Sequence, residues 1–131
     1  MTGLDTNVLV RYFTQDDPIQ SKKATEIIER RLTEDEPGFV SLVTMVETVW
    51  VLGRVYDLSS QEIASVVEGM LQSDTLVIQN EPEVFTATAA LRAGRGSFAD
   101  ALAGALGTWA GCASTLTFDK KTGRLDGFEL V

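Results

Sequence analysis

The chain has 131 residues and a formal net charge of −8, contains no histidine and has a single cysteine, Cys112. This composition excludes catalysis by Ser-His-Asp triads, Cys-His dyads and histidine-based RNA cleavage, and it excludes an internal disulfide. The acidic balance argues against a passive nucleic-acid binder, which normally presents a basic face, but not against an enzyme that meets nucleic acid through a bound metal ion.

Length and ordinary globular composition predict one domain covering residues 1–131. No apolar run approaches the ~20 residues of a membrane span, and the N-terminus lacks the basic leader of a signal peptide. We therefore expect a cytoplasmic protein that does not contact membranes. Cys112 lies in a segment rich in glycine and alanine, which predicts a small buried side chain.

Short β-like runs alternate with helical patterns along the chain. The predicted strands cover residues 2–5, 38–41, 76–78, 115–118 and 128–131. The predicted helices cover residues 7–13, 18–32, 42–56, 60–73, 82–94 and 98–110. Asp17 before Pro18, and Ser59 or Ser60 before Glu62, are helix-start signals. The alternation predicts an α/β fold with a mainly parallel sheet, whose site lies beyond the carboxyl ends of the strands.

Four acidic residues stand alone in otherwise uncharged segments: Asp5, Glu47, Asp100 and Asp119. A carboxylate buried in an apolar element is costly to desolvate unless it is paired or bound to a metal ion. If the strands that end at Asp5 and Asp119 are both central and parallel, the four carboxylates meet at one edge of the sheet. Carboxylates gathered there repel unless a divalent cation neutralises them, and Mg²⁺ or Mn²⁺ fits an all-oxygen site.

Each acid also has a structural alternative. Asp5 can cap the helix that follows it, and Asp119 can be a turn residue before two lysines. Asp100 can complete a capping box with Ser97, because the two residues have the S-x-x-D spacing. Glu47 has the weakest structural explanation, since the helix around it is apolar almost all round.

Around these acids the chain resembles the PIN-domain family, and within it the VapC-type toxins of toxin–antitoxin pairs. The matching strings run from Leu4 to Arg11, Ser41 to Leu52, Phe98 to Leu102 and Thr117 to Lys120, so the resemblance covers essentially the whole chain. The resemblance implies a three-layer α/β/α fold and endoribonuclease activity that depends on Mg²⁺ or Mn²⁺. It also implies a homodimer that is inhibited by a cognate antitoxin.

The same resemblance implies roles for individual residues. Metal-binding and catalytic roles fall on Asp5, Glu47, Asp100 and Asp119, and accessory hydrogen-bonding roles fall on Asn7, Ser41 and Thr117. Ser97 departs from the family pattern, because many relatives have another acid there, so we expect one metal ion and leave a second open.

Basic residues that can meet RNA phosphates are few: Arg11, Arg54, Arg92, Arg95, Lys120 and Lys121. Arg11 and Lys120 are the candidate phosphate contacts, because they lie nearest the acids in sequence.

Within the apolar helix of residues 42–56, the candidates for contact with a second subunit or an antitoxin are Met45, Val49, Trp50 and Val55. A fully internal helix is the alternative. Two other functions stay open: a catalytically silent interaction module of the same fold, and a nuclease that acts on DNA.

Overall fold

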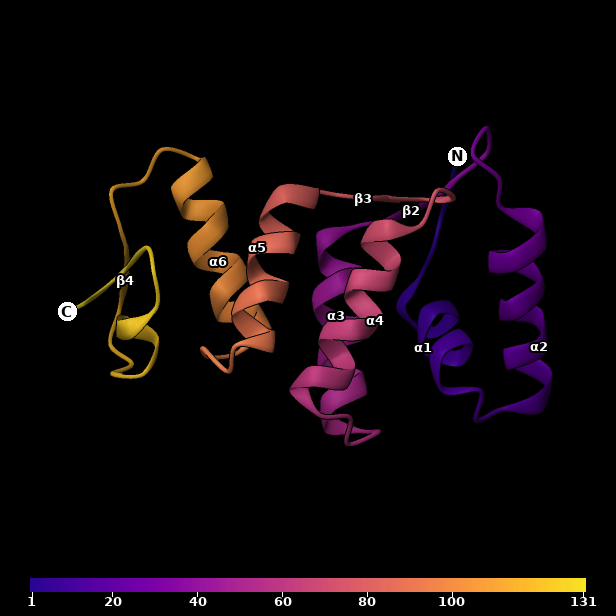
Figure 1. Ribbon diagram of the computed structural model, residues 1–131, viewed down its shortest axis with the longest axis horizontal. Helices are drawn as coiled ribbons and strands as arrows, with labels where there is room; N and C mark the ends of the chain where they lie inside the picture. The colour runs from indigo at the N-terminus through magenta and orange to yellow at the C-terminus, as the bar shows by residue number, and fades with distance from the viewer. The chain divides into compact units, whose positions relative to one another are not determined.

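The computed structural model describes all residues, Met1–Val131, and the chain divides into two compact units, Met1–Gln79 and Asn80–Val131. Figure 1 shows the ribbon of the chain, coloured from indigo at the N-terminus to yellow at the C-terminus, with labels on most of its helices and strands. Every strand pair is parallel, which confirms the predicted α/β class. None of the helices combines the length and the apolar character that a membrane span needs. The single domain over residues 1–131 stays a prediction.

The first unit contains a three-stranded parallel sheet in the order β1-β2-β3. Its strands are short: β1 (Thr2–Gly3), β2 (Gly38–Val40) and β3 (Leu76–Ile78). In Figure 1, β2 and β3 run side by side, and their register pairs Gly38 with Leu76. A Cβ at position 38 would lie 2.8 Å from the Leu32 Cδ1 atom and 3.1 Å from the Leu76 Cδ2 atom, so a larger residue there would require these side chains to shift. The leucines therefore pack directly on the strand backbone.

The helices of the first unit follow the predicted boundaries closely. They are α1 (Thr6–Thr14), α2 (Pro18–Glu26), α3 (Leu42–Arg54) and α4 (Ser60–Gln72). The Asp17 carboxylate accepts hydrogen bonds from the N–H groups of Ile19 and Gln20, which confirms the predicted start of α2. This helix continues to Arg31 as predicted, but its last five residues form a π turn. The core is built from fully buried apolar side chains, the largest being Leu9, Met45, Leu52, Met70, Val40 and Val67.

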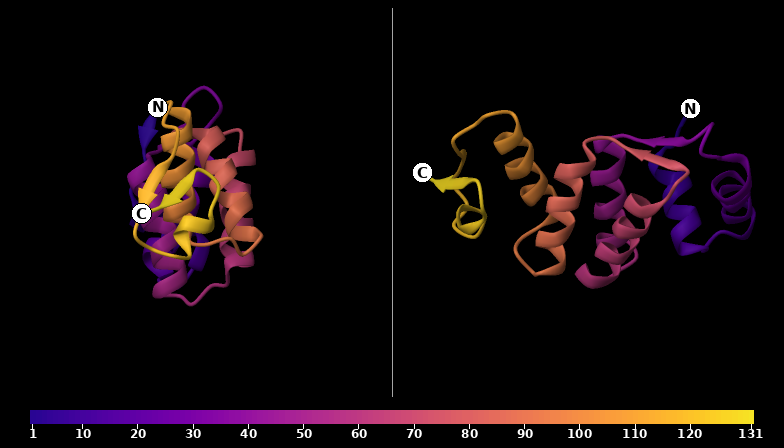
Figure 2. Two further views of the ribbon diagram at one scale, coloured as in Figure 1. Left: turned by 90° about the vertical axis from the view of Figure 1, so that its left-hand side faces the viewer. Right: turned by 45° about the horizontal axis from the view of Figure 1, so that its top comes forward.

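The second unit pairs two helices with a two-stranded parallel sheet. Its elements are α5 (Glu81–Arg92), α6 (Phe98–Trp109), β4 (Thr115–Thr117), the 3₁₀ turn η2 (Thr122–Arg124) and β5 (Phe128–Leu130). Figure 2 shows β4 beside β5, with η2 in the connection between them. A Cβ at Gly104 would lie 2.6 Å from the Phe128 ring, so this glycine lets β5 approach α6 closely.

The structure contradicts one prediction about burial and excludes one alternative that the sequence left open. Cys112 is exposed, because α6 ends at Trp109 and Gly111, at a φ of 96°, turns the chain away from the helix. A fully internal α3 is also excluded. Met45 and Val49 are buried, whereas Trp50 and Val55 have 58% and 64% of their surface exposed.

Candidate functional site

Thr122 joins two of the four predicted acids. Its backbone N–H donates to Asp119 Oδ1 over 2.9 Å, and its hydroxyl donates to Asp100 Oδ2 over 3.3 Å. The Thr122 side chain is itself buried, with 8% of its surface exposed. One threonine thereby holds together Asp100 in the first turn of α6 and Asp119 in the turn after β4.

The Asp100 carboxylate does not take part in a capping box. The Ser97 hydroxyl does cap α6 by accepting from the Asp100 N–H over 3.1 Å, as the spacing predicts. The Asp100 carboxylate does not accept a hydrogen bond from the Ser97 backbone N–H, and it accepts one from the Thr122 hydroxyl instead. Capping as the sole role of Asp100 is therefore wrong, and the half-buried carboxylate is turned toward Thr122 at the start of η2.

Asp119 does act as the turn residue that the sequence offered as an alternative. Besides accepting from Thr122, it accepts the Gly123 N–H at its backbone carbonyl over 2.9 Å. The pKa of Asp119 is lowered, chiefly because the Thr122 backbone N–H stabilises the charged carboxylate, with Lys121 nearby adding to the effect. A turn role and metal ligation are compatible, since a carboxylate ionised well below neutral pH suits a hard cation.

The other two acids belong to the first unit. Asp5 caps α1, because its Oδ1 accepts from the Thr6 N–H over 2.9 Å. Glu47 lies on the exposed side of α3, along with Val43 and Trp50, while Met45 on the opposite side is fully buried. The structural alternative for Asp5 is therefore observed, and Glu47 is solvated rather than set inside an apolar helix.

Two premises of the sequence argument are corrected by these positions. Asp5, Glu47 and Asp119 are exposed, so a desolvation penalty does not explain their isolation in sequence. β1 is an edge strand of the first sheet and β4 belongs to the second sheet, so the two strands are not both central in one sheet. Neither unit contains a group of three or more carboxylate, histidine or cysteine side chains placed to hold a metal ion. The meeting of all four acids stays a prediction.

The three accessory residues do not bond the carboxylates. The Thr117 hydroxyl accepts from the Asp119 backbone N–H over 3.0 Å, and the Ser41 hydroxyl caps α3 through the Thr44 N–H. Asn7 is exposed in the first turn of α1. The residue that does bond the acids, Thr122, was missed. Its position three residues after Asp119 is the spacing at which a side-chain oxygen accepts a backbone N–H at the start of a helical turn.

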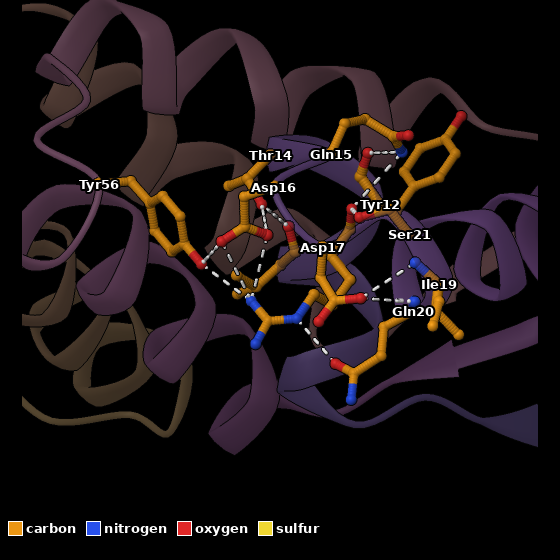
Figure 3. A network of polar contacts seen from close by, with 11 residues as sticks. Tyr12, Thr14, Gln15, Asp16, Asp17, Ile19, Gln20, Ser21 and Tyr56 are labelled. Carbon is orange, nitrogen blue, oxygen red and sulfur yellow. Dashed lines mark hydrogen bonds and ion pairs between the residues drawn. The ribbon is translucent and has the colours of Figure 1, made fainter.

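Arg11, one of the two candidate phosphate contacts, bonds Asp16, Gln20 and Tyr56 in a polar network within the first unit. Figure 3 labels these three partners. The Arg11 Nη1 donates to Asp16 and to the Tyr56 hydroxyl, and its Nε donates to Gln20 over 2.8 Å. Tyr56 also donates to Asp16 over 2.6 Å, which lowers the pKa of that carboxyl. This network ties the end of α1 to the residues after α3. The second candidate, Lys120, is exposed.

The chain thus has parallel sheets covered by helices, and it holds two carboxylates, Asp100 and Asp119, close together. A comparison with protein families finds the PIN domain over residues 4–127, nearly the whole length. The chain belongs to the PIN domain family, whose members are generally nucleases that use divalent metal ions. The predicted fold class is confirmed by this membership. No match was found among curated proteins.

Proposed function

We propose that this protein is an endoribonuclease that depends on Mg²⁺ or Mn²⁺ and hydrolyses RNA phosphodiesters. Its metal-binding and catalytic residues are Asp5, Glu47, Asp100 and Asp119. The observation that carries the proposal is the Thr122 link, which holds two of these carboxylates together in a chain of a nuclease family. Thr122 acts through the acids and is a positioning residue.

The donor chemistry of this pair fits a hard divalent cation. Both side chains offer carboxylate oxygens, and the chain has no histidine to favour a softer ion. Both bonds from Thr122 are donated to the carboxylates, so they stabilise the charged form that a cation requires. When bound, a divalent cation supplies positive charge for the phosphate and a water of lowered pKa. The role of the chain is to hold ionised oxygens at fixed positions.

The test is RNA cleavage by the purified full chain with Mg²⁺, with Mn²⁺ and with EDTA. We expect cleavage only with the metals, and loss of cleavage in Asp119→Asn. Asp35→Asn is the matched control, because it removes an equal charge from an exposed residue outside the site. Cleavage that persists in EDTA and in Asp119→Asn would overturn the proposal. Cutting of a DNA oligonucleotide but not its RNA counterpart would assign a DNA-directed nuclease instead.

Metal binding has a second readout that does not need a substrate. A ligand that binds only the folded chain raises the melting temperature. We expect Mn²⁺ to raise it relative to EDTA in the wild type and in Asp35→Asn, and to raise it much less in Asp119→Asn. Equal shifts in all three proteins count against the acids. Absence of both cleavage and a metal shift would favour a silent interaction module.

The biological role that we propose is that of a toxin held in check by a cognate antitoxin, acting as a homodimer in the cytoplasm. The resemblance to VapC-type toxins supports it, as do the exposed apolar side chains of Val43, Trp50 and Val55 on or next to α3. Expression should arrest growth, and Asp119→Asn should relieve the arrest. Co-expression of the product of an adjacent short reading frame should also relieve it. Arrest that is unchanged in Asp119→Asn would contradict a toxin that acts by cleavage.

A further inference from the structure

A cavity of about 770 Å³ lies within the second unit, and we name it the α6 cavity. Its apolar wall comes from α5 and α6, through Ala90, Ala101 and Ala105. Its charged groups are three cations, Arg95, Lys121 and Arg124, and one carboxylate, Asp126. An excess of cations around a cavity is unexpected in a chain with a net charge of −8, and it favours an anionic ligand.

Two of the cations that line the α6 cavity, Arg95 and Arg124, lie on loops that contact each other. Arg95 lies between Gly94 and Gly96, which both have positive φ, and its N–H donates to the Ala90 carbonyl at the end of α5. A Cβ at Gly96 would lie 2.9 Å from the Leu125 side chain, so the two loops pack in direct contact. Arg124 directly precedes Leu125. The contact therefore brings the loop that carries Arg95 against the loop that carries Arg124.

The turn that holds the acid pair also carries two cations of the α6 cavity. Thr122 is buried and bonds both Asp100 and Asp119, while Lys121 and Arg124 lie close to it in the same turn and line the cavity. The cavity lining includes Ala101, the residue next to Asp100. The cavity and the carboxylate pair are thus neighbours built on the same turn and the same helix.

The α6 cavity also has an aromatic surface. Trp109 ends α6, lines the cavity and has 67% of its surface exposed. Stacking of an unpaired base on an exposed aromatic ring is the usual way in which proteins bind single-stranded nucleic acid, together with cations that contact the phosphates. In a duplex the bases are stacked inside the helix, so a duplex cannot offer the same groups.

We propose that the α6 cavity binds single-stranded RNA next to the carboxylate pair. Arg95, Lys121 and Arg124 contact the phosphates, and Trp109 stacks on one base. This assignment names the surface that holds the substrate, and it rests on the proposed ribonuclease function. An acidic protein segment is the rival occupant, and it lacks the bases that Trp109 would stack on.

The test measures binding of a short single-stranded RNA to the full chain in EDTA, where no cleavage is expected. The background is Trp50→Phe, which leaves Trp109 as the only tryptophan, because the chain has two. We expect RNA to quench the Trp109 fluorescence. In Arg95→Ala/Arg124→Ala, the slope of log affinity against log salt should fall by about 0.7 for each phosphate that the variant no longer neutralises. Trp109→Ala should weaken binding about tenfold, the order of one stacked base.

The matched control is Arg30→Ala/Arg31→Ala, which removes the same charge from exposed residues of the first unit. Equal RNA binding and equal salt slopes in the two double variants would overturn the proposal. So would equal binding of a duplex of the same sequence, or quenching of Trp109 by an acidic peptide but not by RNA. Arg124→Gln serves as the milder variant if the double variant does not fold.

Cleavage with Mn²⁺ separates this inference from the proposed function. If the wild type binds RNA through Trp109 in EDTA but cuts no RNA, the α6 cavity stands as an RNA site and the ribonuclease proposal fails. If the wild type cuts RNA and Arg95→Ala/Arg124→Ala cuts it with an unchanged KM, the ribonuclease proposal stands and the α6 cavity is wrong.

Discussion

Helices α4 and α6 begin with the same pattern, a serine followed three residues later by an acid, yet the two acids have different partners. At α4 the Ser59 hydroxyl accepts from the Glu62 N–H, and the Glu62 carboxylate accepts from the Ser59 N–H over 3.0 Å. At α6 the Ser97 hydroxyl caps the helix, but the Asp100 carboxylate accepts from Thr122 instead. The first acid completes a local cap, and the second is directed to a distant part of the chain.

The length of the acidic side chain accounts for part of this difference. Glutamate, with one more methylene, reaches back to the N–H of the capping residue, and glutamate or glutamine is the usual third residue of the capping box. The comparison shows that one local pattern can serve stability alone or leave a carboxylate available for chemistry. The predictions that follow test this division, starting with the largest effect.

Replacing Asp100 should reduce cleavage strongly, whereas replacing Glu62 should leave it unchanged. Asp100→Asn removes charge from the proposed metal site, and we expect a loss of roughly 10³-fold in kcat/KM, the order found when a group that stabilises transition-state charge is removed. Glu62→Gln keeps a side chain that can cap α4, so cleavage should be unchanged. Both variants are measured with RNA and Mn²⁺ under the same conditions. Comparable losses in the two variants would contradict the division.

Thr122 gives a smaller effect that is specific to the α6 side of the comparison. Thr122→Val keeps the shape and the N–H bond to Asp119 but loses the hydroxyl that Asp100 accepts from. Partners that orient metal ligands typically contribute 10–100-fold, so we expect cleavage to fall by about that factor and the midpoint Mn²⁺ concentration to rise.

Thr122→Ser restores the hydroxyl and should restore both the rate and the metal midpoint. A merely structural role for Thr122 predicts something else, namely a lower melting temperature with no change in the Mn²⁺ midpoint. The two readouts therefore distinguish positioning of Asp100 from packing of η2.

The serines themselves should affect stability by similar amounts. Removing a serine N-cap typically costs about 1 kcal/mol of stability, and each serine accepts one backbone N–H over 3.1 Å. We expect Ser59→Ala and Ser97→Ala each to lower the free energy of unfolding by about this amount in urea titrations. Ser59→Ala should leave cleavage unchanged. A loss several times larger in either variant would show that the serine has a further role.

The contrast also explains which features the sequence could predict. Helix starts at Asp17, Ser59 and Ser97 were predicted correctly because a cap depends on residues within one turn. The contact between Asp100 and Thr122 was missed because it spans 22 positions and exists only once β4 and α6 are folded together. Proximity in sequence also favoured Lys120 as a phosphate contact, and that choice stays a prediction. Distance along the chain is a poor guide to groups that meet through tertiary structure.

Burial was the least predictable property. Apolar neighbours in sequence indicated buried environments for Glu47 and Cys112, and both side chains are exposed. On a helix, neighbours in sequence point in different directions, so a charged residue flanked by apolar ones can still face solvent. Cys112 follows a turn at Gly111, and the composition of its segment carried no information about that turn.

The smallest expected effect concerns the stability of the fold in acid, and it tests the hydrogen bond to Glu62 at the start of α4. The pKa of Glu62 is lowered from 4.5, chiefly because the Ser59 backbone N–H donates to its carboxylate. The unfolded chain therefore binds this proton at a higher pH than the folded chain does. Its contribution to stability is full above the unfolded pKa and is lost as the pH falls through the lower, folded pKa.

The side chain that Glu62→Gln introduces does not titrate, so the melting temperature of this variant should fall less between neutral pH and the acid range than that of the wild type. If the melting temperatures of wild type and Glu62→Gln fall in parallel, the bond from Ser59 does not stabilise the charged carboxylate, and the two helix starts differ only in geometry.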